Sequence, residues 1–438
     1  MKEGEKEPRC TTAVFRRLPD GGLAELVYSR ARTTTSFSVY RGGLVVEQDA
    51  IDLDDGTRLV PVSAGNNLIK HRAVLLPSGA EPYESASELM ARISGYLYKY
   101  VDLSHSFRKI ATCYVLLSWV YDAFNELPYL RLRGDFGSGK TRALSVIGSI
   151  CYRPFFASGA STVSPIFHTL DSFGCTLVLD EGDFRFTDEK SELVKILNNG
   201  NVRGFPVLRT AITMKKEFDP RAFNVYGPKI IAMRRSFEDQ ALESRFLTEE
   251  MGQRALRSDI PINLPDEQAD EALALRNQLL MYRFETLDTV SLRPELVDGA
   301  HSPRLNQILV PLLSLVDDPG IRAEIWSTAG SLEQSLYQER SSTMDAGVLE
   351  ILHPLFEEAG RSHVTVAEVT EAFAARFGSD YERPITNRMI GGILRKRLRL
   401  ALHKSHGVYV IPMSEGPKVT QMAIRFGVVE NPAPEAFG

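Results

Sequence analysis

The chain has 438 residues, of which 43% are hydrophobic and 24% are charged, so it can bury a full core and has the length of about three domains. Its formal net charge of -5 excludes a wholly polybasic protein, although a modular or ring-shaped protein can still bind nucleic acid through a local basic surface. No apolar run approaches the roughly 18 residues of a membrane helix, and no signal-like apolar run follows the charged start. Widely spaced cysteines without a CxxC motif are typical of reduced thiols, so we expect a cytoplasmic protein without a membrane partner.

Residues 1–82 have the pattern of a small antiparallel β module. Short β-branched and aromatic runs are separated by turn signals such as Asp20-Gly21-Gly22, as in successive hairpins. The module carries arginines, among them Arg30, Arg32 and Arg41, and as many acidic residues. It is therefore suited either to nucleic-acid contact or to a collar that shapes an assembly or recruits a partner, and both interpretations stay open.

A helical segment follows the β module. The breaker cluster Pro77-Ser78-Gly79-Ala80-Glu81-Pro82 predicts a linker between the two. Ser85-Ala86-Ser87-Glu88 has the form of a capping box and opens a helix that reaches about Val101. A second helix, from about Phe107 to Phe124, is apolar on most of its faces, which indicates that it is buried.

A phosphate-binding loop comes directly after the short predicted strand that ends at Arg133. Gly134-Asp135-Phe136-Gly137-Ser138-Gly139-Lys140-Thr141 matches GxxxxGK[ST] at every fixed position. Its glycines let backbone N–H groups converge on phosphate oxygens, and the N-terminus of the following helix adds partial positive charge. Lys140 would reach the β- and γ-phosphates, and the Thr141 hydroxyl would ligate Mg²⁺. The sequence therefore predicts ATP and Mg²⁺ as cofactors, with Gly134, Asp135, Phe136, Gly137, Ser138, Gly139, Lys140, Thr141 and Arg142 as the nucleotide-binding residues.

A second motif, Thr176-Leu177-Val178-Leu179-Asp180-Glu181, completes the predicted site. Its apolar residues suit a buried parallel strand, and its two carboxylates fall at the end of that strand, where ligands gather. Asp180 would hold Mg²⁺, usually through water, and Glu181 would polarise the attacking water as general base. The spacing leaves room for a strand near Pro154-Phe155-Phe156 and a helix on either side of it. A strand interposed between the two motifs is the arrangement of the ASCE class of P-loop ATPases.

The order of elements after Glu181 resembles one family. A helix from Glu189 to Leu197, a hairpin from Phe205 to Tyr226, the strand Lys229-Ile230-Ile231-Ala232 and the motif Ser244-Arg245-Phe246 follow in turn. This order resembles AAA+ ATPases of the pre-sensor-1 hairpin group, in particular minichromosome-maintenance-like helicases and related mobile-element or phage replication helicases.

The resemblance assigns roles to three arginines. The Ser-Arg-Phe motif of that group carries the arginine finger, which implies Arg245, and a Ser/Thr-x-Arg at the start of a lid helix carries the second sensor, which implies Arg304. A finger supplied in trans needs a ring or filament with a head-to-tail interface. The first sensor is usually a small polar residue, often Asn, whereas Met233 and then Arg234 occupy its place here. This departure bears on the turnover rate and not on ATP binding.

The expected fold is α/β: an AAA+ P-loop ATPase core with a helical lid, an N-terminal β module and a C-terminal winged-helix domain. The alternation of strands and helices from Gly134 to about Phe246 predicts the mostly parallel sheet of the core. The expected parts are a β module at 1–82, a helical segment with the ATPase core at 83–252, a helical lid and connector at 253–343, the winged helix at 344–413 and a loose tail at 414–438.

Two segments are candidates for DNA contact. Lys215 and Lys216 lie near the expected tip of the hairpin, which projects into the pore of the resembled helicases, although a solvated turn is an equally open interpretation. In the winged helix, the stretch from 388 to 404 holds no acidic residue, which favours phosphate contact over protein contact. Its basic residues are Arg388, Arg395, Lys396, Arg397, Arg399 and Lys404.

We therefore expect an ATP-hydrolysing hexameric DNA translocase or helicase for the replication of a mobile element or phage. Single-stranded DNA would pass through the pore, and duplex DNA could bind the winged helix. The alternative is an ATP-dependent DNA-binding switch, such as an initiator, loader or segregation factor, that assembles without processive unwinding. The Met233-Arg234 departure slightly favours this alternative.

Overall fold

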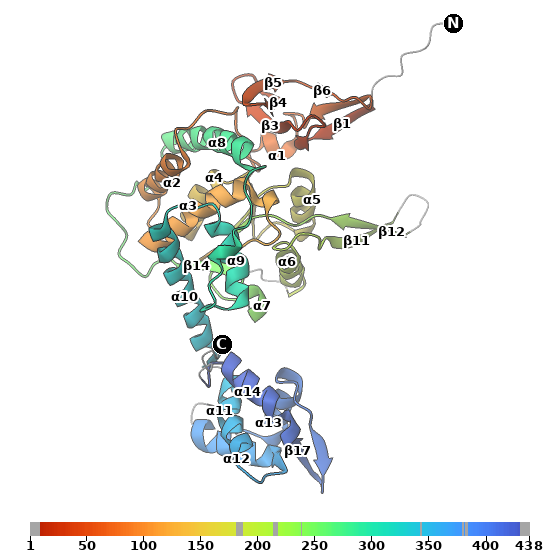
Figure 1. Ribbon diagram of the computed structural model, residues 1–438, viewed down its shortest axis with the longest axis vertical. Helices are drawn as coiled ribbons and strands as arrows, with labels where there is room; N and C mark the ends of the chain where they lie inside the picture. The colour runs from red at the N-terminus through yellow and green to blue at the C-terminus, as the bar shows by residue number, and fades with distance from the viewer. Residues whose placement is uncertain are drawn as a thin grey trace. The chain divides into compact units, whose positions relative to one another are not determined.

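The structure is a computed structural model that describes residues 9–180, 187–212, 218–237, 239–341, 344–378, 381 and 384–429. The chain divides into two compact units, Met1–Gly330 and Ser331–Gly438 (Figure 1). The first unit therefore contains the β module, the predicted ATPase core and the chain that follows the core up to residue 330. No helix in the described part of the chain is both long enough and apolar enough to span a bilayer.

A parallel sheet of five strands lies at the centre of the first unit. Its strands are β8 (Tyr129–Arg133), β9 (Phe155–Ser158), β10 (Leu177–Asp180), β13 (Lys229–Met233) and β14 (Phe246–Glu250). Their order across the sheet is β14-β8-β13-β10-β9, and every neighbouring pair is parallel. The predicted mixed α/β fold with a parallel sheet is confirmed. Because the strands are parallel, all their carboxyl ends meet at one edge of the sheet.

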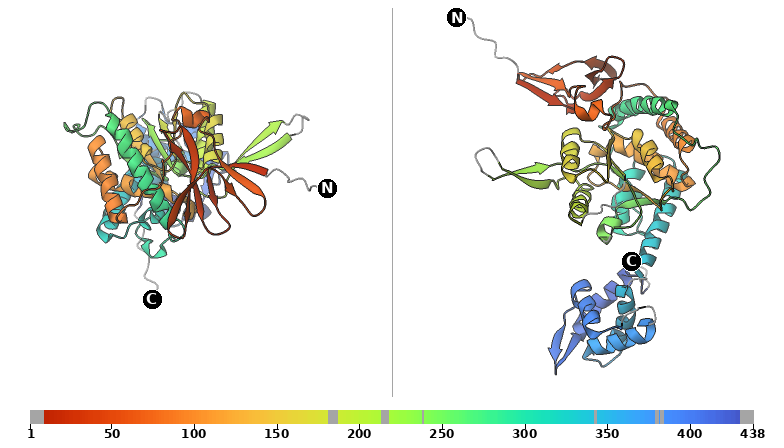
Figure 2. Two further views of the ribbon diagram at one scale, coloured as in Figure 1. Left: turned by 90° about the horizontal axis from the view of Figure 1, so that it is seen from above. Right: turned by 180° about the vertical axis from the view of Figure 1, so that it is seen from behind.

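Helices cover both faces of this sheet (Figure 2). Leu130 and Leu132 of β8 belong to one apolar cluster, whereas Tyr129 of the same strand belongs to another. This alternation follows from the opposite directions of successive side chains on a strand. The first cluster is completed by α2 (Ala86–Tyr100), α3 (His105–Trp119), α4 (Lys140–Ser149), α8 (Asp266–Thr286) and α9 (Pro303–Leu313). The second is completed by α5 (Val163–Phe173) and α6 (Thr187–Asn199).

The N-terminal module contains two small sheets. An antiparallel sheet has the order β2-β3-β4-β5, and a second sheet has the order β1-β7-β6. The pair β1 and β7 is parallel, so the expectation of a purely antiparallel module is wrong there. The strands are β1 (Arg9–Ala13), β2 (Phe15–Arg17), β3 (Leu23–Ser29), β4 (Thr34–Arg41), β5 (Leu44–Gln48), β6 (Ile51–Asp52) and β7 (Thr57–Pro61), and the short helix α1 (Asn67–Lys70) follows them.

The segment predicted as a linker, Pro77–Pro82, is fixed to α8. The Asn277 side chain accepts a hydrogen bond from the Ser78 backbone N–H at 2.9 Å and donates one to Glu81 Oε1 at 2.8 Å. In addition, the Glu81 N–H donates to the Asn277 carbonyl at 3.0 Å. The β module is therefore tied to the helical layer rather than tethered to it by a free connection.

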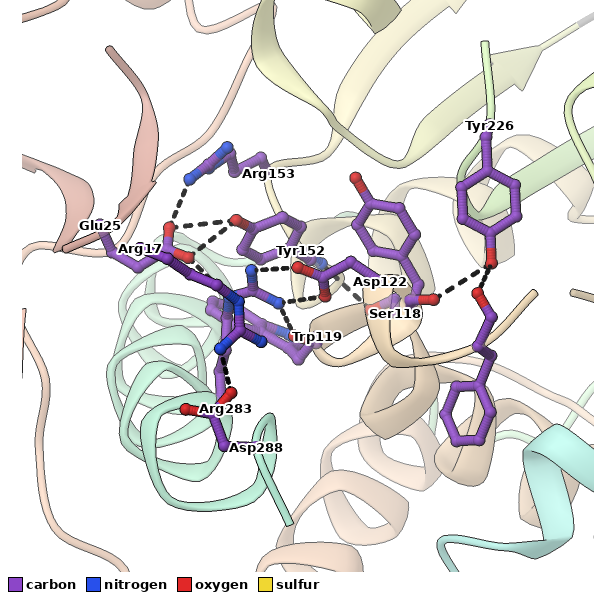
Figure 3. A network of polar contacts seen from close by, with 12 residues as sticks. Arg17, Glu25, Ser118, Trp119, Asp122, Tyr152, Arg153, Tyr226, Arg283 and Asp288 are labelled. Carbon is purple, nitrogen blue, oxygen red and sulfur yellow. Dashed lines mark hydrogen bonds and ion pairs between the residues drawn. The ribbon is translucent and has the colours of Figure 1, made fainter. Parts of the chain in front are cut away.

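A buried charge network also joins the β module to the helical layer (Figure 3). Glu25 of β3 is only 1% exposed, and its carboxylate accepts hydrogen bonds from Arg283 Nε at 2.6 Å and from the Tyr152 hydroxyl at 2.9 Å. The carboxylate also pairs with Arg153. Arg283 of α8 donates to Asp122 through Nη1 at 2.7 Å and Nη2 at 2.8 Å. Two guanidinium groups and two carboxylates thus balance one another where β3, α8 and the segment after α3 meet.

Glu25→Ala should lower the free energy of unfolding by about 3–5 kcal/mol, because it leaves two buried guanidinium groups with a single carboxylate. Chemical denaturation of the full chain measures this loss. The control is Glu47→Ala, which removes an exposed ion pair with Arg32 in the same module and should hardly move the denaturation midpoint. Equal shifts for the two variants would contradict the structural role of the network.

The second unit holds four α-helices and a small sheet among its described residues. The helices are α11 (Met344–Glu357), α12 (Val366–Phe377), α13 (Asn387–Gly392) and α14 (Gly416–Arg425), and the strands are β15 (His363–Thr365), β16 (His403–Ser405) and β17 (Val408–Pro412) in the order β15-β17-β16. The helix α10 (Pro319–Ser341) crosses the boundary between the two units. The predicted capping box at Thr365 and Glu368 is present at the start of α12.

Two predictions for this unit need correction. The third helix was expected to reach Leu400, but α13 ends at Gly392 and continues as a π-helical turn, Ile393–Arg397, before Arg399 adopts a φ of 53°. The segment from 414 was expected to be a loose tail, but Gly416–Arg425 form α14. Val419 of α14 is buried in the apolar core of this unit. An amphipathic helix of this length needs such a core to be stable, and the sequence alone did not show one.

Candidate active site

The predicted phosphate-binding loop joins the end of β8 to the start of α4. Gly137 and Gly139 have φ angles of 75° and 86°, in the left-handed region that side chains rarely adopt. A Cβ atom at Gly134 would lie 2.5 Å from the Met251 carbonyl oxygen and 2.8 Å from Ser138 Oγ. Backbone conformation therefore favours glycine at the fixed position 139 and at the variable position 137 of the motif, and close packing requires it at the fixed position 134.

Lys140 points back into this loop. Its ammonium group donates to the carbonyl oxygens of Gly134 at 2.7 Å and Asp135 at 2.6 Å, and to Ser138 Oγ at 3.3 Å. All three acceptors are neutral oxygens. A phosphate oxygen is a stronger acceptor for an ammonium group than a neutral oxygen, so the same position suits the binding of a nucleotide phosphate.

A cavity of about 640 Å³ opens beside the loop. This volume lies in the range of small-molecule sites. Arg133, Arg142, Arg234 and Arg254 line it together with the loop residues from Gly134 to Gly139, so its walls carry positive charge that complements a polyphosphate. Arg142 also donates to the Pro261 and Ile262 carbonyls. The cavity's size and charge therefore fit ATP.

The predicted metal ligands lie at the same edge of the sheet. Thr141 is exposed on the first turn of α4, and the half-buried Asp180 ends β10, which β13 separates from β8. Neither of them lines the cavity, and neither does Lys140. Glu181, the predicted general base, lies outside the described residues. A hydroxyl and a carboxylate are oxygen ligands of the type that Mg²⁺ prefers. Bound Mg²⁺ would neutralise phosphate charge at this edge.

Arg234 follows β13 directly, which is where the first sensor was expected. It lines the cavity, and its guanidinium carbon lies 5.7 Å from the centroid of the Phe136 ring. Phe136 itself is 88% exposed. A cation instead of an amide therefore faces the nucleotide cavity from the end of the fourth core strand.

The other two predicted arginines lie at the opposite edge of the sheet. Arg245 immediately precedes β14, whose register with β8 is parallel, so it belongs to the amino ends of the strands. Its Nη1 donates to the Asn198 carbonyl and to Asn198 Oδ1, both at 2.8 Å, at the C-terminus of α6. Arg304 is the second residue of α9, and its Nη1 lies 3.9 Å from Oε2 of Glu126, just before β8. Neither arginine is among the described residues that line the nucleotide cavity.

Arg304 lies close enough to Arg245 to affect the ionisation of the Arg245 guanidinium. Burial lowers the pKa of the Arg245 guanidinium, and the nearby Arg304 lowers it further. The half-buried Arg245 also has a buried Nε atom without a hydrogen-bond partner in the described structure. A buried donor without a partner is costly, so Arg245 Nε suits an additional hydrogen-bond acceptor at this edge.

The predicted hairpin is present as β11 (Val207–Ile212) and β12 (Phe218–Phe223), which pair antiparallel. Lys215 and Lys216 lie outside the described residues. The base of the hairpin is fixed by Lys229, whose Nζ donates to the carbonyls of Gly200 at 3.1 Å, Val225 at 2.8 Å and Gly227 at 2.9 Å. Burial lowers the pKa of Lys229 to about 7. Because Gly200 directly follows α6, Lys229 links the hairpin base to the helix end that holds Arg245.

The predicted basic residues of the second unit lie in different surroundings. Arg388, Arg395 and Lys396 line a cavity of about 550 Å³ beside β17, where the Arg395 guanidinium carbon lies 5.1 Å from the Tyr409 ring centroid. Arg397 instead pairs with Asp345 of α11 at 2.9 Å. The Arg399 carbonyl accepts a hydrogen bond from Lys418. Lys404 is exposed on β16.

Sequence reasoning missed the segment that closes the nucleotide cavity after β14. Met251 donates its N–H to the Arg133 carbonyl at 2.6 Å. Arg254 lies 3.3 Å from Glu249 Oε1 and 3.7 Å from Asp102 Oδ1. Asp102 also lines the cavity. No motif marks these residues, because their position depends on a strand pairing between segments more than a hundred residues apart.

The chain matches no known family model, and no curated protein matches it. Among solved structures it is similar to the NrS-1 C-terminal region, with 12% identity and a TM-score of 0.36 over 89% of this chain and 96% of that one. It is also similar to a full-length MCM homolog from Methanopyrus kandleri, with 11% identity and a TM-score of 0.37 over 73% of this chain and 75% of that one. A third is the Aeropyrum pernix ORC1 protein in complex with DNA, with 13% identity and a TM-score of 0.21 over 78% of this chain and 98% of that one. These values are too low to say what the chain does.

Proposed function

We propose that the protein is an AAA+ ATPase in which one subunit supplies an arginine to the nucleotide held by the next. The observation that carries this proposal is the position of Lys140 and Arg245 at opposite edges of one parallel sheet. A subunit built in this way presents a phosphate site on one side and a pair of arginines on the other. Head-to-tail association then brings them together.

In this proposal, residues of two adjacent subunits take part in the hydrolysis of each ATP. Backbone N–H groups of Gly134–Gly139 and the ammonium group of Lys140 hold the phosphates, and Thr141 and Asp180 hold Mg²⁺. Glu181 orients and deprotonates the attacking water. Arg245, with Arg304 beside it, stabilises the charge that develops on the transferred phosphoryl group. Arg234 adds a cation at the place of the usual amide.

The proposed motor function depends on the hairpin and on the second unit. We propose that the subunits form a hexameric ring, that Lys215 and Lys216 contact single-stranded DNA in its pore, and that the ring translocates on or unwinds DNA during replication of a mobile element or phage. The second unit acts as a winged helix that binds duplex DNA through Arg388, Arg395, Lys396 and Lys404. Support for this division comes from the cavity that the first three of these residues line and from the exposure of Lys404.

The second candidate is an ATP-dependent DNA-binding switch. The observation that favours it is Arg234, because an arginine cannot position the attacking water as an amide does, and slow turnover suits a switch better than a motor. Such a protein binds ATP, assembles on DNA and hydrolyses slowly.

Steady-state ATP hydrolysis of the full chain, with and without single-stranded DNA, separates the two candidates. The motor should show DNA-stimulated hydrolysis and strand separation on a forked substrate, and Glu181→Gln should bind ATP without hydrolysing it. If ATP and DNA both bind while hydrolysis stays negligible and indifferent to DNA, the motor proposal fails and the switch stands.

A further inference from the structure

A second, smaller cavity lies where the end of β3, the turn after α1 and α8 meet. Its volume is about 40 Å³, and Arg30, Arg72 and Arg276 line it. It shares no lining residue with the nucleotide cavity, and none of the described residues that line it is acidic. A void of this size holds about three water molecules, which is room for a phosphate group but not for a nucleoside.

Arg276 is the buried member of this group. It is 7% exposed, and it donates through Nη1 to the Ser149 carbonyl at 2.6 Å and through Nε to the Leu76 carbonyl at 3.4 Å. Both acceptors are neutral. Over the described ranges, no carboxylate forms an ion pair with Arg276, Arg30 or Arg72. Buried charges are normally paired, so this guanidinium lacks its usual counterion.

The buried arginines around Glu25 differ from Arg276 in their partners. Arg153 and Arg283 are buried as well, but each has a carboxylate partner. Arg276 has two further arginines nearby instead. Burial lowers the pKa of Arg276 to about 10, and Arg72 and Arg30 contribute to that fall. The cavity therefore brings three arginines together with no carboxylate among the described residues that line it.

The surface around the cavity is also basic. Arg30 and Arg72 are exposed, and so are Lys70 and His71, which precede Arg72 in the chain. Arg72 has a φ of 58°, an unusual conformation for a residue other than glycine. A chain of phosphates can cross this surface, whereas a free nucleotide finds no room for its base in the cavity.

We propose that Arg30, Arg72 and Arg276 bind a backbone phosphate of nucleic acid and make the N-terminal β module a nucleic-acid contact. The cavity takes one phosphodiester group, and the exposed basic residues beside it receive its neighbours in the same strand. This role goes beyond the proposed function, which assigns no task to the module, and it does not depend on ATP.

Fluorescence anisotropy of the full chain without nucleotide tests this contact, using a labelled 40-nucleotide single strand of mixed sequence and its duplex across a salt series. The variant is Arg30→Gln/Arg72→Gln, which spares Arg276 and the carbonyl groups it holds. Affinity should fall about tenfold or more near 100 mM salt, and the slope of log K against log salt should lose roughly 0.7–0.9, the contribution of one phosphate contact.

The matched control is Arg16→Gln/Arg58→Gln, which removes the same charge from exposed positions in the same module. It should keep at least most of the wild-type affinity and slope. An equal loss in the control would overturn the proposal, because it would reflect only the overall charge. An unchanged salt slope in Arg30→Gln/Arg72→Gln would also overturn the proposal. Calorimetry with inorganic phosphate is the third arm: phosphate binding that is lost in the variant while DNA binding is kept would mark a small-anion site instead. Because ATP is absent throughout, failure of the ATPase proposal leaves this result intact.

Discussion

Arg245→Ala should reduce kcat for ATP hydrolysis by about 10³-fold or more while ATP still binds. An arginine supplied by a neighbouring subunit stabilises the charge on the transferred phosphoryl group and has an effect of this size. Arg245 cannot act on its own subunit's nucleotide, because β14 has five residues, which separates the two edges of the sheet by about 17 Å.

Mixing experiments give the sharpest form of this test. Arg245→Ala subunits keep Lys140, and Lys140→Ala subunits keep Arg245, so an interface between the two contains one intact site. Steady-state hydrolysis of the mixture should therefore recover part of the wild-type rate, although each variant alone is inactive.

The control for Arg245 is Asn198→Ala. This change removes the side-chain acceptor that Arg245 uses on α6 but leaves the guanidinium in place, so hydrolysis should fall little. If Asn198→Ala and Arg245→Ala were equally inactive, or if the mixture stayed inactive, Arg245 would only fix the end of α6 and the trans role would be wrong.

Lys140→Ala should weaken ATP binding by about 10–100-fold, because a hydrogen bond to a charged group contributes about 1.5–3 kcal/mol. Hydrolysis should fall further, by about 10²–10³-fold, since the same ammonium group stabilises charge in the transition state. Titration with a fluorescent ATP analogue measures the first effect, and steady-state hydrolysis measures the second.

The control for Lys140 is Lys99→Ala, which removes an exposed lysine that pairs with Glu271 on the surface of the first unit. Both ATP binding and hydrolysis should stay at the wild-type level in this variant. Unchanged nucleotide affinity in Lys140→Ala would show that the loop does not hold phosphate, and the ATPase proposal would then fail at its first step.

The local elements of this fold were readable from the sequence because short-range chemistry sets them. Gly137 and Gly139 of the loop are favoured by local backbone angles. Thr365 and Glu368 cap α12 as their spacing predicted. The strand near Phe155 and the hairpin of β11 and β12 are present as well. Each of these features depends on residues that are neighbours in the chain.

Some features depend instead on contacts between residues that are distant in sequence. The predicted linker at Pro77–Pro82 is hydrogen-bonded to Asn277, and Gly416–Arg425, expected to be a loose tail, form a helix because Val419 packs in an apolar core. The basic residues after 388 have different surroundings: Arg397 pairs with Asp345, whereas Arg388 and Arg395 line a cavity. No local pattern reports these partners.

By itself, the sequence predicted a phosphate-binding loop, a parallel α/β core and a set of candidate arginines. Only the tertiary structure decided which of these arginines lines the cavity beside the loop, because strand order and direction place Arg234 at the carboxyl edge and Arg245 at the amino edge. The tertiary structure also decided which buried guanidinium groups have carboxylate partners. Arg283 pairs with Glu25 and Asp122, whereas Arg276 pairs with no carboxylate in the described part of the chain. The physical reason is the same in both cases: a motif fixes chemistry over a few residues, whereas charge balance and the edge of a sheet arise from segments that meet only on folding.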